Sequence, residues 1–273
     1  MFFRFASLKL TWTYLGVSLV INGFLIGILA FLMLGGQDQQ SSAPDDRGDR
    51  KSVLAAIPQL GPRHQLNYQE WVDLLDQEAR AVAETQPENL NILAGDSISL
   101  WFPPDLLPVD RVWLNQGISG ETSAGLLKRL NLFDNTKPDN IFVMIGINDL
   151  IRGIPPEDVL TNNREIVSYL KWAHPRSRII VQSILPHSAE GATWEGRDRL
   201  LALPNRKIQD LNQQLALMAA EEGVYYLDLN SLFMDATGNL RLELTTDGLH
   251  LNHQGYWVWR SALIVFSQTA SKP

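Results

Sequence analysis

The hydropathy of the chain changes sharply after its first few dozen residues. Residues 10–37 contain no charged residue, and residues 15–34 are almost wholly apolar. A run of about 20 apolar residues matches the hydrocarbon core of a bilayer, which is about 30 Å thick. We therefore expect residues 1–36 to form a cytoplasmic stub followed by one transmembrane helix.

Charges beside this run predict its orientation. Two basic residues precede it and three acidic residues follow it: Arg4 and Lys9, then Asp38, Asp45 and Asp46. The positive-inside tendency puts the N-terminus in the cytoplasm and the remaining chain outside. The alternative is secretion after cleavage of a signal peptide, although such peptides usually have apolar cores of only about 7–15 residues. Residues 37–66 are polar or broken by Pro and Gly, which is typical of a flexible linker.

Residues 67–273 form the expected globular domain, in which short apolar runs alternate with amphipathic segments. The apolar runs that predict strands are 91–94, 112–114, 140–145, 178–183 and 224–229. Helical spacing of apolar residues predicts helices over 68–85, 123–132, 156–173, 205–222 and 252–267. This alternation is typical of parallel βαβ units, whose strands are covered on both faces. The pattern therefore predicts an α/β fold with a parallel sheet.

Residues that could take part in catalysis follow three of the predicted strands. Ser97, Gly117 and Asn148 each come just after an apolar run. The carboxyl ends of parallel strands meet at one edge of a sheet, where ligands bind, so we expect these residues to converge. A serine at a helix N-terminus is a candidate nucleophile, and a Gly117 N–H and the Asn148 amide are candidate oxyanion donors. The alternatives are a helix cap for Ser97, a turn for Gly117 and a capped loop for Asn148.

Asp247 and His250 lie three residues apart near the end of the chain. Within one turn, the carboxylate can bind one imidazole nitrogen while the other nitrogen faces a serine as general base. The alternatives are a surface turn with a solvated histidine, or a metal-dependent hydrolase that uses Asp247, His250 and His253. The metal alternative lacks the H-E-x-x-H pattern and leaves Ser97 and Asn148 without roles.

Composition argues against several other functions and kinds of site. The chain has 273 residues, a formal charge of −7 and no cysteine. An acidic balance argues against a nucleic-acid partner, because binding phosphates needs clustered Lys and Arg. Without cysteine there can be no disulfide, no thiol nucleophile and no Cys-ligated zinc.

Four segments in order resemble the sequence blocks of the SGNH hydrolases, also called the GDSL esterase/lipase family. They are Gly95-Asp96-Ser97-Ile98, the segment 115–122 (NQGISGET), the segment 143–150 (VMIGINDL) and the segment 247–256 (DGLHLNHQGY). The resemblance implies a flavodoxin-like three-layer α/β/α sandwich with about five parallel strands. It also implies Ser97 as nucleophile, His250 as base, Asp247 as its partner, and the Ser97 N–H, Gly117 N–H and Asn148 as the oxyanion hole. No metal or organic cofactor is expected.

The expected function is hydrolysis of a carboxylic ester in a lipid, a lysophospholipid or an acylated saccharide. The alternative is a non-catalytic anchored binding module with the same fold. Specificity should come from loops at the strand ends, where Trp101, Phe102 and Trp194 are candidates to contact substrate. Ordinary packing of those loops is the competing interpretation.

Overall fold

The structure is a computed structural model in which residues 66–269 are described. These residues belong to one compact unit, which spans residues 61–273. The predicted anchor, residues 1–36, lies outside the described residues, as does nearly all of the predicted linker, residues 37–66. Among residues 66–269, no helix is both long and apolar enough to cross a membrane.

A five-stranded parallel sheet forms the centre of the domain, in the order β2-β1-β3-β4-β5. The strands are β1 (Leu90–Gly95), β2 (Val112–Gly117), β3 (Asn140–Met144), β4 (Arg178–Gln182) and β5 (Tyr225–Leu227). Every residue of β1 and β3 is buried. Such burial is expected of strands covered on both faces, so the predicted parallel α/β sheet is confirmed.

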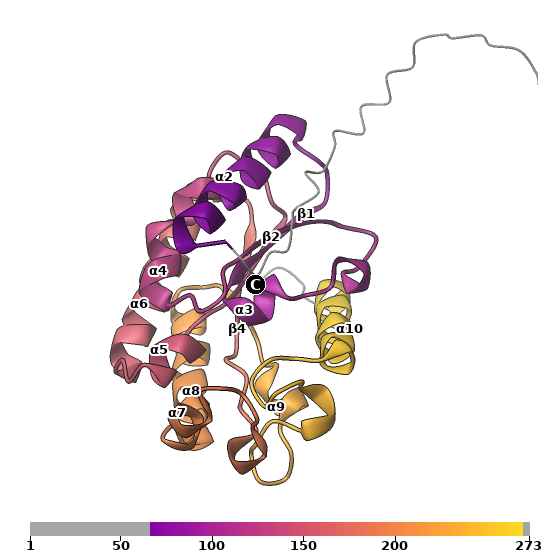
Figure 1. Ribbon diagram of the computed structural model, residues 1–273. Helices are drawn as coiled ribbons and strands as arrows, with labels where there is room; N and C mark the ends of the chain where they lie inside the picture. The colour runs from indigo at the N-terminus through magenta and orange to yellow at the C-terminus, as the bar shows by residue number, and fades with distance from the viewer. Residues whose placement is uncertain (1–65, 270–273) are drawn as a thin grey trace, which may run out of the picture. The chain divides into compact units, whose positions relative to one another are not determined.

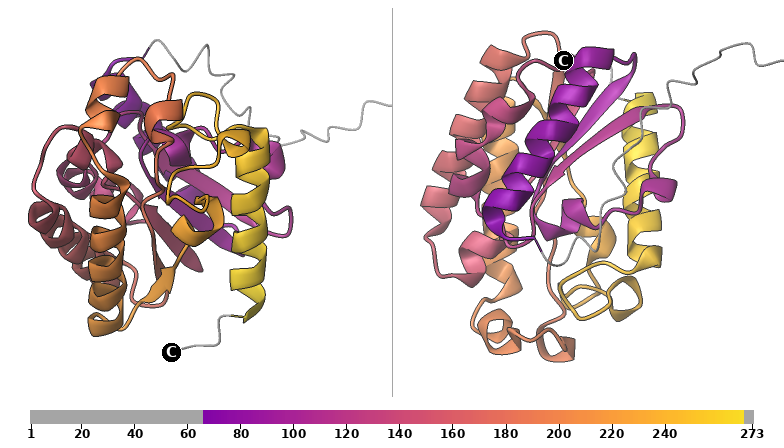
Figure 2. Two further views of the ribbon diagram at one scale, coloured as in Figure 1. Left: turned by 90° about the horizontal axis from the view of Figure 1, so that it is seen from below. Right: turned by 45° about the horizontal axis from the view of Figure 1, so that its top comes forward.

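Helices cover both faces of this sheet (Figures 1 and 2). One face is covered by α2 (Tyr68–Thr85), α4 (Ser123–Lys128), α6 (Pro156–Ala173) and α8 (Asn205–Glu221), and the other by α10 (His253–Thr269). Short helices follow the strands: α3 (Ser97–Leu100), α5 (Ile147–Ile151), α7 (Arg197–Leu201) and α9 (Asn230–Phe233). The arrangement has the three layers expected from the sequence.

Helix α2 shows why its boundaries could be predicted. A capping box starts it: the Asn67 side chain accepts the Glu70 N–H, and the Asn67 N–H donates to the Glu70 carboxylate at 2.7 Å. This reciprocal pair satisfies two backbone N–H groups, those of Asn67 and Glu70, that would otherwise lack partners. The helix then buries residues at helical spacing against the sheet: Trp71, Leu74, Leu75 and Ala79.

The helix predicted over residues 123–132 is interrupted. Helix α4 ends at Lys128, Arg129 leaves the helical conformation, and a 3₁₀ helix follows over Leu130–Phe133. The Arg129 side chain is buried and bound to Glu121, whereas a continuing amphipathic surface helix would present a charged side chain to water. The helical pattern could not reveal this inward charge.

Helix α10 is held against the sheet by an aromatic cluster. The Trp259 ring is fully buried, and its Nε1–H donates to Gln182 Oε1 at 2.8 Å, at the end of β4. Phe102 packs against Trp259 with ring centroids 5.0 Å apart. A buried indole N–H needs such a partner, and this bond fixes the helix that follows the predicted base, His250.

Replacing Leu93 by alanine tests the importance of the central strand. Leu93 is 0% exposed in β1, so Leu93→Ala should lower the free energy of unfolding by about 2–5 kcal/mol through lost burial and a cavity. Leu217→Ala is the matched control, because Leu217 is 66% exposed on α8 and its loss should change stability by less than about 0.5 kcal/mol. Urea unfolding monitored by circular dichroism measures both. Equal losses in the two variants would contradict the placement of β1 in the core.

Candidate active site

Ser97 is the first residue of α3, directly beyond the end of β1. Asp96 caps this short helix, because its side chain accepts the Ile98 N–H at 3.0 Å. The capping role that competed for Ser97 therefore belongs to Asp96. The Ser97 hydroxyl instead meets His250, with Oγ and Nε2 3.1 Å apart although the residues are 153 positions apart in the sequence.

Asp247 and His250 form a closed turn. His250 Nδ1 lies 2.8 Å from one oxygen of Asp247, and the other oxygen accepts the backbone N–H groups of Leu249 and His250. Partial burial alone would raise the pKa of Asp247, but these hydrogen bonds, above all from the His250 ring, hold it below its usual value. An ionised carboxylate at Nδ1 favours the tautomer whose Nε2 accepts a proton from Ser97.

The loop that carries Trp194 is hydrogen-bonded to this turn. The Trp194 N–H donates to the Asp247 carbonyl at 2.9 Å, and the Ser188 N–H donates to the Gly248 carbonyl at 2.8 Å. The Trp194 ring is half-buried and stacks under the Arg199 guanidinium at 5.4 Å. Trp194 thus lies beside the Asp247 backbone and makes a structural contact there.

Gly117 does not occupy the expected role. Its N–H already donates to Asn115 Oδ1 at 3.0 Å, and the residue is buried at the end of β2. A side chain here would meet the backbone nitrogen of Leu100 at 2.5 Å, so glycine is needed for the close approach of α3 to β2. The structure therefore corrects the expectation that the Gly117 N–H is free for an oxyanion.

Gly120, three residues further on, has the properties that Gly117 lacks. Its φ is +74°, a conformation that favours glycine. Among residues 66–269, no acceptor is bound to its N–H. The next carbonyl, that of Glu121, accepts the Asn148 amide Nδ2 at 3.1 Å, which brings Asn148 beside this turn. The sequence contained one signal for this role, a second glycine that lies within the loop and not at the end of the strand.

A buried ion pair lies beneath these groups and was not identified from the sequence. Arg129 Nε donates to Glu121 Oε2 at 2.7 Å, and Arg129 Nη2 donates to the Gly95 carbonyl at 3.3 Å. The two side chains are 3% and 4% exposed. Asp149, also buried, accepts the Ser123 N–H and hydroxyl. The loops after β1, β2 and β3 are therefore joined by polar side chains. No local pattern distinguishes such long-range partners from surface charges.

The other two aromatic candidates have different environments. Trp101 ends α3 and is half-buried, close to Ser97 in the chain. Phe102 is only 2% exposed and packs between Tyr256 and Trp259, with ring centroids 5.1 and 5.0 Å away. This burial makes Phe102 a core residue and removes it from the surface that a substrate could touch.

The structure does not bring Asp247, His250 and His253 together as a set of metal ligands. Within the described part of the chain, no cluster of three or more His, Cys, Asp or Glu side chains is arranged to hold a metal ion. His253 is exposed at the start of α10 and lies near Trp257, with ring centroids 6.4 Å apart. His250 instead places its two ring nitrogens against Asp247 and Ser97.

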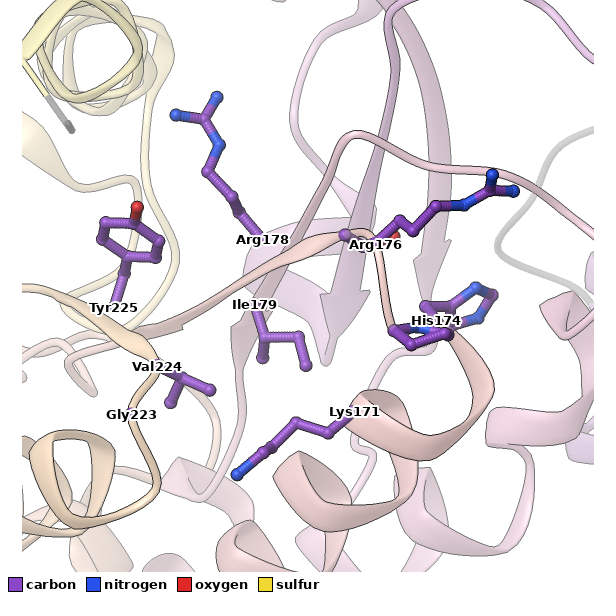
Figure 3. Close-up of a pocket in the computed structure, with 10 residues that line it drawn as sticks. Lys171, His174, Arg176, Arg178, Ile179, Gly223, Val224 and Tyr225 are labelled. Atoms are coloured by element: carbon purple, nitrogen blue, oxygen red, sulfur yellow. The ribbon is translucent and has the colours of Figure 1, made fainter. Parts of the chain in front are cut away.

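A pocket of about 640 Å³ lies at the amino ends of the strands, where β4 and β5 begin and opposite the ends that carry Ser97 (Figure 3). Its lining includes Lys171, His174, Arg176, Arg178 and Tyr225. Lys171 already pairs with Glu222, and Arg178 donates to Asn140. The charged ends of Lys171 and Arg178 point away from each other in Figure 3. None of the candidate catalytic residues lines this pocket, so it is separate from the site at Ser97.

Replacing Asp96 by asparagine tests the electrostatics beside Ser97. Burial, with smaller contributions from Asp149 and Glu121, raises the pKa of Asp96 from 3.8 to about 7. Between these values the folded protein keeps a proton that the unfolded chain has released. Stability from this group is therefore complete below pH 3.8 and is lost as pH rises through about 7, at up to ~1.4 kcal/mol per pH unit.

Asp96→Asn keeps an acceptor for the Ile98 N–H but does not titrate, so this decline in the free energy of unfolding should disappear. Urea titrations of the wild type and the variant between pH 4 and 8 measure it. Asp105→Asn, which changes an exposed carboxylate, is the control and should follow the wild type. Parallel profiles for wild type and Asp96→Asn would contradict the assignment.

Comparison with known proteins places this site in a family. Residues 95–258 match the GDSL-like Lipase/Acylhydrolase family. An isoamyl acetate-hydrolyzing esterase of Saccharomyces cerevisiae is 30% identical over 57% of this chain and 68% of its own length. An N-acylneuraminate cytidylyltransferase of Streptococcus agalactiae is 29% identical over 51% of this chain, but the match spans only 31% of that protein.

Solved structures agree on the fold. A protein from Streptococcus pneumonia described as a platelet activating factor superposes with a TM-score of 0.65 and 27% identity, covering 72% of this chain and 93% of that chain. A GDSL-like lipase from Bacteroides thetaiotaomicron gives a TM-score of 0.59 at 20% identity, covering 72% and 100%. With the family match across most of the described domain, these findings show that the chain belongs to the GDSL-like lipase/acylhydrolase family.

Proposed function

We propose that this protein is a serine esterase that hydrolyses a carboxylic ester through an acyl-enzyme on Ser97. The observation that carries the proposal is the continuous hydrogen-bond chain from Ser97 Oγ through His250 to Asp247, with distances of 3.1 and 2.8 Å. A serine hydroxyl within reach of an imidazole that a carboxylate orients is the arrangement that activates serine for acyl transfer. The family relatives named as esterases support the same reaction class.

In the proposed reaction, His250 Nε2 accepts the Ser97 hydroxyl proton while Oγ attacks the ester carbonyl carbon. The imidazolium that forms is stabilised by the Asp247 carboxylate, and it then protonates the leaving alcohol. Water then attacks the acyl carbonyl carbon as His250 Nε2 accepts a proton from it. The bond to Oγ breaks, the imidazolium returns the proton to Ser97 Oγ, and the acid is released. Asp247 stays ionised throughout, because its hydrogen bonds hold its pKa low.

The negative oxygen of each tetrahedral intermediate needs donors at the same strand ends. We assign this role to the Ser97 N–H, the Gly120 N–H and the Asn148 amide. Gly120 replaces Gly117 in this assignment, because the Gly117 N–H is occupied by Asn115. Asn148 uses one amide hydrogen on the Glu121 carbonyl, which orients the group and leaves its second hydrogen for the oxyanion.

The natural ester and the location are further parts of the proposal. We propose a lipid, a lysophospholipid or an acylated saccharide as substrate, with Trp101 and Trp194 as neighbouring apolar contacts. We also propose that residues 1–36 anchor the protein in a membrane with the catalytic domain outside the cytoplasm. The support for the anchor is the uncharged run of residues 10–37 and the charges on its two sides.

Ser97→Ala should lower ester turnover by at least ~10³-fold while the protein stays folded, because the nucleophile is lost. Turnover of 4-nitrophenyl acetate and labelling by a fluorophosphonate, located by mass spectrometry, measure the effect. Ser99→Ala is the matched control, since Ser99 lies on the same short helix and its hydroxyl has no hydrogen-bond partner among the described residues. Full turnover in Ser97→Ala, or no labelled serine in active wild type, would overturn the mechanism.

Asn148→Ala should lower kcat by about 10²–10³-fold with little change in KM, because an oxyanion donor acts mainly in the transition state. Asn162→Ala serves as the control, since the Asn162 amide binds Ser123 in the same neighbourhood without reaching the proposed oxyanion site. Steady-state kinetics on one short-chain ester compares the three proteins. An effect confined to KM would argue against an oxyanion role for Asn148.

A further inference from the structure

Arg152 is tied to both sides of the proposed oxyanion site. Its backbone N–H donates to the carbonyls of Asn148 and Asp149, so it lies one helical turn beyond Asn148. Its Nη2 donates to the Gly120 carbonyl at 2.7 Å. The guanidinium is therefore held next to the residue whose N–H we assign to the oxyanion hole.

This guanidinium forms no salt bridge. In residues 66–269, no Asp or Glu oxygen forms an ion pair within 4 Å with a nitrogen of Arg152, and Arg152 is exposed. Other arginines of this acidic chain do have such partners: Arg80, Arg111, Arg164, Arg197 and Arg206. Asp149, the nearest acid in sequence, attracts Arg152 electrostatically, but both of its oxygens are bound to Ser123 and it forms no salt bridge with the guanidinium.

An arginine in this state is suited to bind an anion. It presents several N–H donors in a planar fork that matches carboxylate and phosphate oxygens, and only one bond is made to Gly120. The same bond restrains the side chain before any ligand arrives, which reduces the entropy lost on binding. Water competes for an exposed site, so the effect should be moderate and sensitive to salt.

We propose that Arg152 binds a negatively charged group, a carboxylate or a phosphate, on the ester substrate, and so makes this site selective for anionic esters. The inference rests on the proposed esterase function, because it assigns the substrate class of that same site. Arg152 acts here as a specificity-determining residue, separate from the groups that transfer protons.

Matched esters test the proposal. Three aryl acetates differ in the group opposite the ester: 4-acetoxybenzamide is neutral, 4-acetoxybenzoate carries a carboxylate and 4-acetoxyphenyl phosphate carries a phosphate. A second pair, 4-nitrophenyl valerate and mono-4-nitrophenyl glutarate, places the charge on the acyl side. The measured quantity is the kcat/KM for each anionic ester divided by that for its neutral partner.

In Arg152→Gln this ratio should fall by about tenfold for at least one anionic ester, as expected for a hydrogen bond to a charged group. The change should lie mainly in KM, and Arg152→Lys should restore part of the ratio because it keeps the charge. Added salt should lower the wild-type ratio and leave the Arg152→Gln ratio nearly constant. Arg176→Gln, at the exposed opposite edge of the sheet, is the control and should match the wild type.

Two results would overturn the inference: ratios that are unchanged in Arg152→Gln for every pair, or an equal fall for neutral and anionic esters. The second result would mean that Arg152 acts only by positioning Gly120. Failure of the proposed function is distinguishable, since the wild type would then hydrolyse no ester. In that event calorimetric titration with benzoate and phenyl phosphate decides, because binding that is equal in wild type and Arg152→Gln, or absent from both, would also overturn the inference.

Discussion

The buried ion pair between Glu121 and Arg129 is the interaction on which the geometry of the site depends. Arg129 reaches the carbonyl of Gly95, two residues before Ser97, while Glu121 belongs to the turn after β2. The backbone carbonyl of Glu121 in turn receives the Asn148 amide. Ser97, this turn and the Asn148 amide lie in segments that follow three different strands, so their relative positions depend on contacts that cross between loops.

Such a pair carries an energetic consequence. Removing two charges from water costs several kcal/mol for each ion, and their attraction offsets this only when the geometry is good and the remaining donors are satisfied. One nitrogen of Arg129, Nη1, has no partner among the described residues, so the pair is weak evidence for stability. Its value lies in fixing one arrangement of the loops, since any other arrangement would leave a buried charge without its partner.

The fold was predictable to the extent that its signals are local. Helices α2 and α6 have the boundaries expected from periodicity, because a capping box starts one and a proline pair starts the other. The strands were found as apolar runs, since a sheet covered on both faces leaves little choice of residue. The break at Arg129 was missed, because an inward arginine and a surface arginine look alike in a sequence.

The same distinction separates the placements of site residues that the sequence could predict from those that it could not. Ser97, Asp247 and His250 come together because parallel strands deliver their loops to one edge, and topology could be read from the alternation of elements. Gly117 was misassigned because no sequence pattern states which backbone N–H is already bound to a side chain. Phe102 looked available in an apolar loop, but its burial depends on α10, which is distant in the sequence.

The charges around Ser97 affect how the proposed oxyanion could be stabilised. Glu121, Asp149 and Asp96 all lie near Ser97, and the buried cation Arg129 lies among them. Burial raises the pKa of Asp149 and brings that of Asp96 to about 7, so Asp96 is substantially protonated near neutral pH. A protonated Asp96 lessens the repulsion that a negative intermediate on Ser97 would otherwise meet. The negative charges that remain near Ser97 would still repel this intermediate. Donors in direct contact with its oxygen would have to counter that repulsion, and backbone N–H groups and an amide already held by other hydrogen bonds can do so without reorganising.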